Sequence, residues 1–212
     1  MRYLSVAIVS IFGLGQLFSC GGGKAIHHYN LGVEAAQRGD LDEAIARWRE
    51  SLVHRSDDPD TRYNLGQAYL QSGRYEEAER QFRAAEAVRP DDHELQYALG
   101  RALEMQGDDS GAKRAYRFAI DIMPNFHSAY TAFAAIVLRQ ELFSSAEQYA
   151  SEALRFAPRD EKASLVLAET YYRQANYQAA YAQLISSRSF LMNNPRYLLL
   201  LGMTMNARHM YT

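Results

Sequence analysis

NLGQAYLQSG, residues 64–73, is followed after Arg74 by YEEAERQFRAAEAV, residues 75–88. In both segments apolar residues recur three and four positions apart, which predicts two amphipathic helices. Gly73 lies between them, where the end of a helix commonly needs a left-handed residue that glycine supplies without steric cost. Pro90 then stops the second helix. The stretch therefore predicts a helical hairpin.

The same hairpin recurs at positions 34 residues apart. A Leu-Gly pair or its equivalent falls in register, without insertions, at 31–32, 65–66, 99–100, 133–134, 167–168 and 201–202. The same register aligns Ala44, Ala78, Ala112, Ala146 and Ala180. One hairpin cannot bury its apolar face alone, so such units must stack. We expect full units at 25–58, 59–92, 93–126, 127–160 and 161–194 and a partial sixth at 195–212.

This pattern resembles the tetratricopeptide repeat over most of the chain. The resemblance implies an all-α fold, a superhelical solenoid of antiparallel helix hairpins with five full repeats and a partial sixth. Small residues at Gly66 and Ala78 let paired helices approach closely, and Phe82 fills the adjoining space. Glu141 and Ala175 depart from the pattern, because they stand where the inter-helix glycine is expected. Each should cost up to about 1 kcal/mol if that residue is left-handed.

The first 19 residues differ from the rest of the chain. Arg2 precedes a mostly apolar run that is shorter than the roughly 20 apolar residues of a membrane-spanning helix and fits a secretory signal. The run ends in LFSC, residues 17–20, which resembles the bacterial lipobox. That resemblance implies a signal peptide at 1–19, lipid attachment at Cys20, and a short glycine linker over 20–24. An uncleaved anchor and an ordinary signal peptide stay open as alternatives.

Charge and composition exclude several classes of function. The formal net charge is -2, with Lys and Arg spread along the chain, so the basic patch of a nucleic-acid binder is missing. A single cysteine cannot form an internal disulfide or a cysteine metal site. The six histidines show no metal-binding spacing, and no glycine-rich phosphate loop occurs. We expect no metal and no cofactor.

The family resemblance predicts a peptide-binding groove lined by the first helix of each repeat. Its residues in this chain are Tyr29, Asn30, Tyr63, Asn64, Gln67, Tyr97, Arg101, Thr131 and Leu165. Tyrosines offer flat apolar area plus a hydroxyl, which suits an extended peptide or a partner helix. A second interpretation is that these tyrosines partly serve stacking between repeats. The clamp with which cytosolic co-chaperones of this family hold acidic tails is matched only by Asn64.

One stretch spells a catalytic motif. Ser110 to Lys113 reads S-x-x-K, the nucleophile motif of penicillin-recognising enzymes, and it makes an exported serine hydrolase a remote alternative. Ala112 belongs to the recurrent alanine column, however, which predicts that the stretch is the first turn of a helix. The companion S-D-N and K-T-G triplets are missing from the sequence. The sequence therefore favours a protein that is not an enzyme.

The sixth unit stops after its first helix. Leu198 to Leu201 with Met203, Met205 and Met210 leave that helix little polar face, whereas a solenoid needs a polar terminal cap. Either this end packs on a partner or on another copy of the chain, or the sequence is truncated.

The sequence as a whole predicts a membrane-anchored scaffold that binds other proteins of the bacterial envelope. A lipobox followed by such repeats resembles the pilotin lipoproteins that assemble the secretin of type IV pili. An adaptor lipoprotein that docks peptidoglycan enzymes or envelope proteases is the alternative. Gly21 after the cysteine resembles the signal for the outer membrane, so we expect a lipid anchor there, facing the periplasm.

Overall fold

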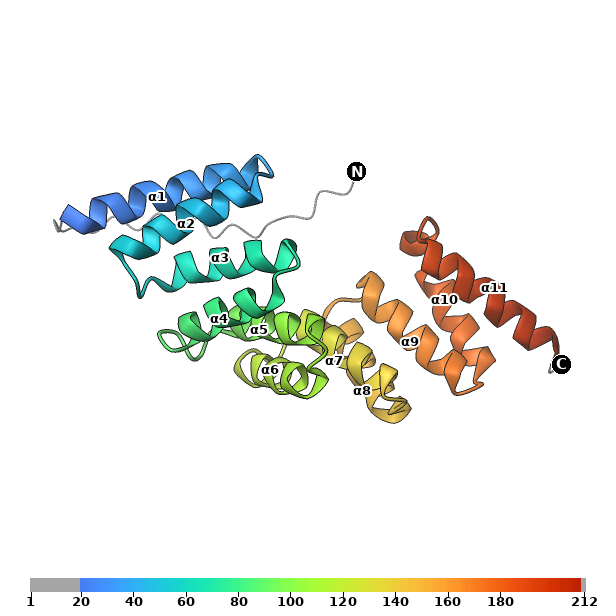
Figure 1. Cartoon of the computed structure of the whole chain (residues 1–212). Coiled ribbons are helices and arrows are strands. Elements are labelled where there is room, and N and C mark those ends of the chain that lie inside the picture. Colours follow the sequence, from blue (N-terminus) through green and yellow to red (C-terminus); the bar gives the residue numbers. More distant parts are fainter. Residues whose placement is uncertain (1–19, 211–212) are drawn as a thin grey trace. The chain divides into compact units, whose positions relative to one another are not determined.

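The computed structural model describes residues 20–210, and in that range the chain is built from helices joined by short turns (Figure 1). The described helices are α1 (Cys20–Gln37), α2 (Leu41–His54), α3 (Pro59–Gln71), α4 (Tyr75–Glu86), α5 (His93–Met105), α6 (Asp109–Ile122), α7 (His127–Arg139), α8 (Phe143–Phe156), α9 (Glu161–Arg173), α10 (Tyr177–Leu191) and α11 (Pro195–Met210). The predicted all-α repeat fold is confirmed.

The chain divides into two compact units. Unit 1 ends at Ala112 and holds α1 to α5, and unit 2 begins at Lys113 and holds α7 to α11, so that the boundary falls within α6. Consecutive helices pack as hairpins in both units: α1 on α2 and α3 on α4 in unit 1, α7 on α8 and α9 on α10 in unit 2 (Figure 1). Each hairpin then packs on the next through its second helix, as α4 does on α5 and α8 on α9.

Short polar side chains fix where several helices begin. The side chains of Asp40, Asp58, Asp92, Asp160 and Asn176 each accept a hydrogen bond from a backbone N–H in the first turn of the helix that follows. These bonds satisfy donors that the helix itself cannot pair, which contributes about 1 kcal/mol for each cap. The caps therefore fix the first residue of these helices.

Two glycines let paired helices approach closely in unit 1. A Cβ atom at Gly32 would lie 2.6 Å from the Trp48 ring, and one at Gly66 would lie 2.5 Å from the Phe82 ring. Phe82 is fully buried and Trp48 is nearly so. The predicted role of the small residue in this position is therefore confirmed for both hairpins.

The residue between the two helices of a hairpin is left-handed in both units. Gly39, Gly73 and Gly107 have φ of 81°, 75° and 86°, and Glu141 and Ala175 have φ of 61° and 59° at the corresponding places. The turn therefore keeps its conformation even where glycine is replaced. Because a Cβ atom is disfavoured at positive φ, Glu141 and Ala175 carry the strain that the sequence predicts for them.

Helix α1 begins earlier than the sequence indicates. The first repeat and its helix were expected from Ala25, after a linker over 20–24, whereas α1 starts at Cys20. A Cβ at Gly22 or Gly23 would meet nothing within 4 Å, so these glycines serve no close packing. Ala25 is buried, and its carbonyl oxygen accepts a hydrogen bond of 2.9 Å from Ser51 Oγ on α2. The predicted signal segment, 1–19, lies outside the described residues.

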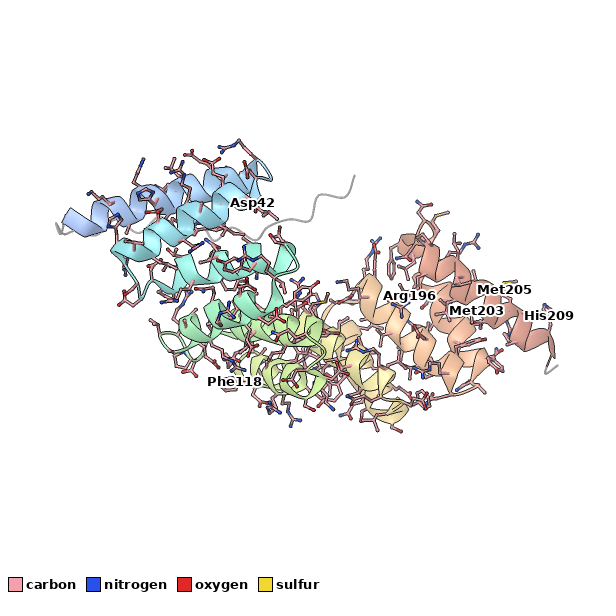
Figure 2. The ribbon with its side chains drawn as sticks, in the orientation of Figure 1. Asp42, Phe118, Arg196, Met203, Met205 and His209 are labelled. Atoms are coloured by element: carbon pink, nitrogen blue, oxygen red, sulfur yellow. The ribbon has the colours of Figure 1, made fainter. Side chains whose placement is uncertain are left out.

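The last helix has one buried and one exposed face. Tyr197 and Leu200 are buried in a cluster with residues of α9 and α10, whereas Leu198 and Leu199 are 53% and 66% exposed. Figure 2 shows Met203 and Met205 further along α11, and these are 41% and 43% exposed. The exposed apolar side chains match the expectation from the sequence, but Arg196 and His209 are exposed on the same helix. Among the described helices, none combines enough length with enough apolar character to cross a bilayer.

Candidate functional site

A surface cavity of about 560 Å³ lies in unit 1. Helix α1 contributes Tyr29, and α3 contributes Asp60, Tyr63 and Asn64; the connection from α4 to α5 and the start of α5 complete the wall with Arg89, Pro90, Asp91, Asp92, His93 and Glu94. Its volume falls in the range of about 300–1,000 Å³ that is usual for ligand pockets. The cavity is therefore large enough to take in a peptide side chain and part of its backbone.

The first wall of the cavity is fixed by a hydrogen bond between two repeats. Asn64 Nδ2 donates to the Tyr29 hydroxyl at 3.0 Å, and only 6% of Asn64 is exposed. Burial raises the pKa of Tyr29, the Asn64 bond opposes this, and the carboxylates of Asp60 and Asp58 raise it further. The phenol is thus held neutral in one orientation, and its own O–H is left to donate to a ligand.

The second aromatic wall is Tyr63, which packs on the core of its own hairpin. Its ring centroid lies 5.9 Å from that of buried Phe82 in a tilted arrangement. Burial raises the pKa of Tyr63, a hydrogen bond with Gln67 opposes this, and Glu94 and Asp92 raise it further. Such an aromatic ring, half-buried and already ordered, loses little rotamer entropy when a ligand binds.

Ion pairs organise the floor of the cavity. One Nη of Arg89 lies 3.0 Å from an Asp60 oxygen and 3.7 Å from an Asp92 oxygen. Asp92 also caps α5 by accepting a hydrogen bond of 3.1 Å from the backbone N–H of Leu95. Arg89 therefore ties α3 to the start of α5 through two carboxylates.

Several predicted groove residues lie in unit 1, and three of them line the cavity. Tyr29, Tyr63 and Asn64 come together there. The other four lie outside the cavity wall: Asn30 and Arg101 are exposed, and Gln67 and Tyr97 are half-buried. Tyr29 and Tyr63 both stand two residues before the recurrent leucine of their repeat, whereas Tyr97, in the same register position, does not line the cavity.

Two predicted groove residues in unit 2 are not on an open surface. Thr131 is 5% exposed, and its Oγ1 lies within hydrogen-bond distance of two acceptors, the backbone oxygen of His127 at 3.1 Å and Asp160 Oδ2 at 3.0 Å. Leu165 is also 5% exposed and belongs to a buried cluster with Leu184 and Tyr197. Internal hydrogen bonding and apolar packing therefore occupy these side chains, and the groove prediction does not extend to them.

Sequence reasoning missed the acidic half of the cavity. Asp60, Asp91, Asp92 and Glu94 line it, and none of them belongs to the predicted groove. A signal was present in RPDDHE, residues 89–94, where three carboxylates follow the helix-stopping proline. Asp91 and Asp92, in the turn before α5, and Glu94, in its first turn, line the same cavity as α1 and α3.

The S-x-x-K stretch forms the start of α6, as predicted. Gly111 donates its backbone N–H to Asp108 Oδ1 at 2.8 Å, which is a bond typical of a helix start. Lys113 Nζ donates to Gln140 Oε1 at 2.7 Å on the neighbouring hairpin. In the part of the chain that the structure describes, no group of His, Cys, Asp and Glu side chains could hold a metal ion.

Comparisons with known proteins agree with the repeat fold. Residues 35–103 match the family model described as tetratricopeptide repeat. No curated protein sequence matches the chain.

Solved structures match nearly the whole described fold. MamA from Desulfovibrio magneticus RS-1, from its residue 41 to its end, has a TM-score of 0.75 at 20% identity, over 83% of this chain and 99% of that one. PilF from Pseudomonas aeruginosa has a TM-score of 0.75 at 19% identity, over 90% and 88% of the two chains. YrrB, described as a TPR protein with an unusual peptide-binding site, has a TM-score of 0.68 at 20% identity, over 82% and 90%. The chain therefore has the tetratricopeptide-repeat fold, and residues 35–103 match the family itself.

Proposed function

We propose that this protein is a tetratricopeptide-repeat scaffold that binds a peptide segment of another protein in the cavity of unit 1. The fold is one that serves protein–protein interaction, and YrrB, a TPR protein with a peptide-binding site, shares it. The observation that carries the proposal is the pair of ordered tyrosines, Tyr29 fixed by Asn64 and Tyr63 packed on Phe82, facing one cavity.

Photo-cross-linking in the native cell tests this function. A benzophenone amino acid replaces Tyr29 in the cavity or, as the matched control, Arg49, which is exposed on α2. The proposal predicts a discrete adduct from position 29 that mass spectrometry identifies as another protein, and no such adduct from position 49. Equal adducts from both positions, or none from position 29, would contradict it.

The finer form of the proposal places this scaffold on the bacterial outer membrane, held by a lipid on Cys20, where it assembles the secretin of a type IV pilus. Its support is the lipobox-like LFSC at residues 17–20, whose cysteine is the first residue of α1. Several acyl chains would anchor the protein firmly, whereas one binds a membrane only marginally. Because α1 starts at Cys20, such an anchor would hold the first repeat close to the bilayer.

Metabolic labelling with radioactive palmitate tests the anchor separately. The unaltered chain should incorporate label and fractionate with the outer membrane, and Cys20→Ser should lose both properties. Label retained by Cys20→Ser would overturn the anchor but leave the peptide-binding function standing. If the adduct from position 29 contains a protein other than a secretin, the pilus role is contradicted and the peptide-binding function stands.

A further inference from the structure

The cavity of unit 1 carries an excess of negative charge. Four carboxylates line it, from Asp60, Asp91, Asp92 and Glu94, against the one guanidinium of Arg89. These four negative charges and one positive charge give a formal balance of -3. The whole chain has a net charge of only -2, so the cavity concentrates negative charge far above the average of the molecule.

The single arginine does not neutralise the part of the cavity formed by Asp91 and Glu94. Its ion pairs run to Asp60 and Asp92, at 3.0 and 3.7 Å. Asp91 and Glu94 are exposed, and no Lys or Arg of the described chain forms an ion pair with either of them. These two carboxylates are therefore open to a cation from outside the chain.

The two tyrosines add aromatic faces to the same cavity. Burial raises the pKa of both tyrosines. Glu94 and Asp92 raise that of Tyr63 further, against Arg101. Asp60 and Asp58 raise that of Tyr29 further, against Arg89. The rings therefore stay neutral beside negative charge. A Lys or Arg cation within about 6 Å of such a ring is attracted by its π face, by about 0.5–1 kcal/mol when exposed and more when desolvated.

We infer that the cavity binds a basic peptide segment, with a Lys or Arg side chain held by the rings of Tyr29 and Tyr63 and the carboxylates of Asp91 and Glu94. This inference rests on the proposed function and gives the partner its chemistry. Charge complementarity selects the occupant, because an acidic segment would meet like charges at every unpaired carboxylate. The preference is opposite to that of a clamp that grips an acidic tail.

Fluorescence anisotropy with two matched peptides tests the inference on the full chain. One labelled peptide alternates lysine with alanine, and the other carries glutamate in place of each lysine. We expect the lysine peptide to bind at least about tenfold more tightly, which corresponds to about 1.4 kcal/mol. Its affinity should fall as salt is raised, because ions screen exposed charges. Equal affinity for the two peptides would overturn the inference.

Variants that remove carboxylate charges test whether Asp91 and Glu94 cause the preference for the lysine peptide. The double variant Asp91→Asn with Glu94→Gln should weaken the lysine peptide about tenfold, while Glu76→Gln, exposed in the first turn of α4, should leave its affinity unchanged. Both sets of changes are at the surface, so the fold is kept. Equal affinity of the double variant and the unaltered chain would overturn the assignment.

The remaining outcomes separate this inference from the proposed function. If both peptides bind equally and Tyr63→Ala removes both, peptide binding stands and the charge preference fails. If neither peptide binds, the inference fails, and cross-linking from position 29 decides the proposed function independently. Spermidine that binds as tightly as the lysine peptide would overturn the assignment to a peptide.

Discussion

Gly66 in unit 1 and Gly202 in unit 2 occupy the same place in the repeat register, yet only Gly66 is covered. A Cβ at Gly66 would lie 2.5 Å from the Phe82 ring of α4, whereas a Cβ at Gly202 would meet nothing within 4 Å. Three positions further on, Tyr69 is 5% exposed and Met205 is 43% exposed. The two helices carry the same pairing face, and the difference is the second helix packed on α3.

The repeat pattern therefore specifies which face of a helix is apolar, but not whether another helix packs on that face. In α3, α5 and α7 the residue in the Met205 position is buried: Tyr69 at 5%, Leu103 at 5% and Val137 at 2%. In α11 that face meets solvent in the described chain, and Figure 2 shows Met205 there. The cost of a substitution should therefore depend on the neighbour and not on the position in the repeat.

The largest expected effect on stability comes from removing the Phe82 ring, which packs against Gly66. Phe82→Ala removes a fully buried side chain from the α3–α4 hairpin and should lower the free energy of unfolding by about 3–5 kcal/mol. Met205→Ala removes a side chain that is 43% exposed and should change the free energy of unfolding by less than about 0.5 kcal/mol. Urea unfolding followed by circular dichroism measures both. A similar loss of unfolding free energy in the two variants would contradict this difference between Phe82 and Met205.

The next effect comes from the two glycines themselves. Gly66→Ala places a methyl group 2.5 Å from a buried ring, and such overpacking should cost about 1–3 kcal/mol. Gly202→Ala enters open space on a helix, where alanine is favoured over glycine by up to about 1 kcal/mol. Opposite shifts of the urea midpoint are therefore expected. A loss of stability in Gly202→Ala would show that something covers α11 in solution.

A smaller pair of changes compares the turns of the two units. Gly73→Ala puts a Cβ on a residue with φ of 75° and should destabilise unit 1 by about 1–2 kcal/mol. Ala175→Gly removes a Cβ at φ of 59° and should stabilise unit 2 by up to a similar amount, about 1 kcal/mol. Differential scanning calorimetry resolves the sign of each change. A stability loss in Ala175→Gly would contradict the left-handed turn there.

The smallest expected effect is a pH dependence from the cavity tyrosines. The pKa of Tyr29 and of Tyr63 is raised in the folded chain, chiefly by burial. A group with a raised folded pKa stabilises the fold fully below its unfolded pKa and loses that contribution as pH rises through the folded pKa. Stability should therefore fall in alkali, and less so in Tyr63→Phe. If Tyr63→Phe lost as much stability in alkali as the unaltered chain, the raised pKa of Tyr63 would be contradicted.

The sequence predicts the elements that depend on local spacing. The spacing of Leu65, Gly66 and Phe82 predicts the hairpin, because all three residues belong to the contact between its two helices. The left-handed turn at Glu141 and Ala175 follows from register alone, and their positive φ values agree. Local spacing therefore identifies the turns even where the residue type does not.

Other features depend on packing that one sequence does not show. Thr131 and Leu165 occupy groove positions in the register, but hydrogen bonds to His127 and Asp160 enclose the first and packing near Tyr197 encloses the second. The carboxylates of the cavity come from a turn and a helix start, where no repeat pattern marks them. The start of α1 at Cys20 likewise runs against the low helix propensity of three successive glycines.

The central claim is that the first helices of unit 1 form a peptide site. Backbone amide NMR of the full chain, titrated with the lysine–alanine peptide, tests it most directly. The account predicts that the largest shift changes lie at Tyr29, Tyr63 and Glu94, on α1, α3 and α5, and that they vanish in Asp91→Asn with Glu94→Gln. Changes confined to α2 and α4, or to the exposed face of α11, would contradict it.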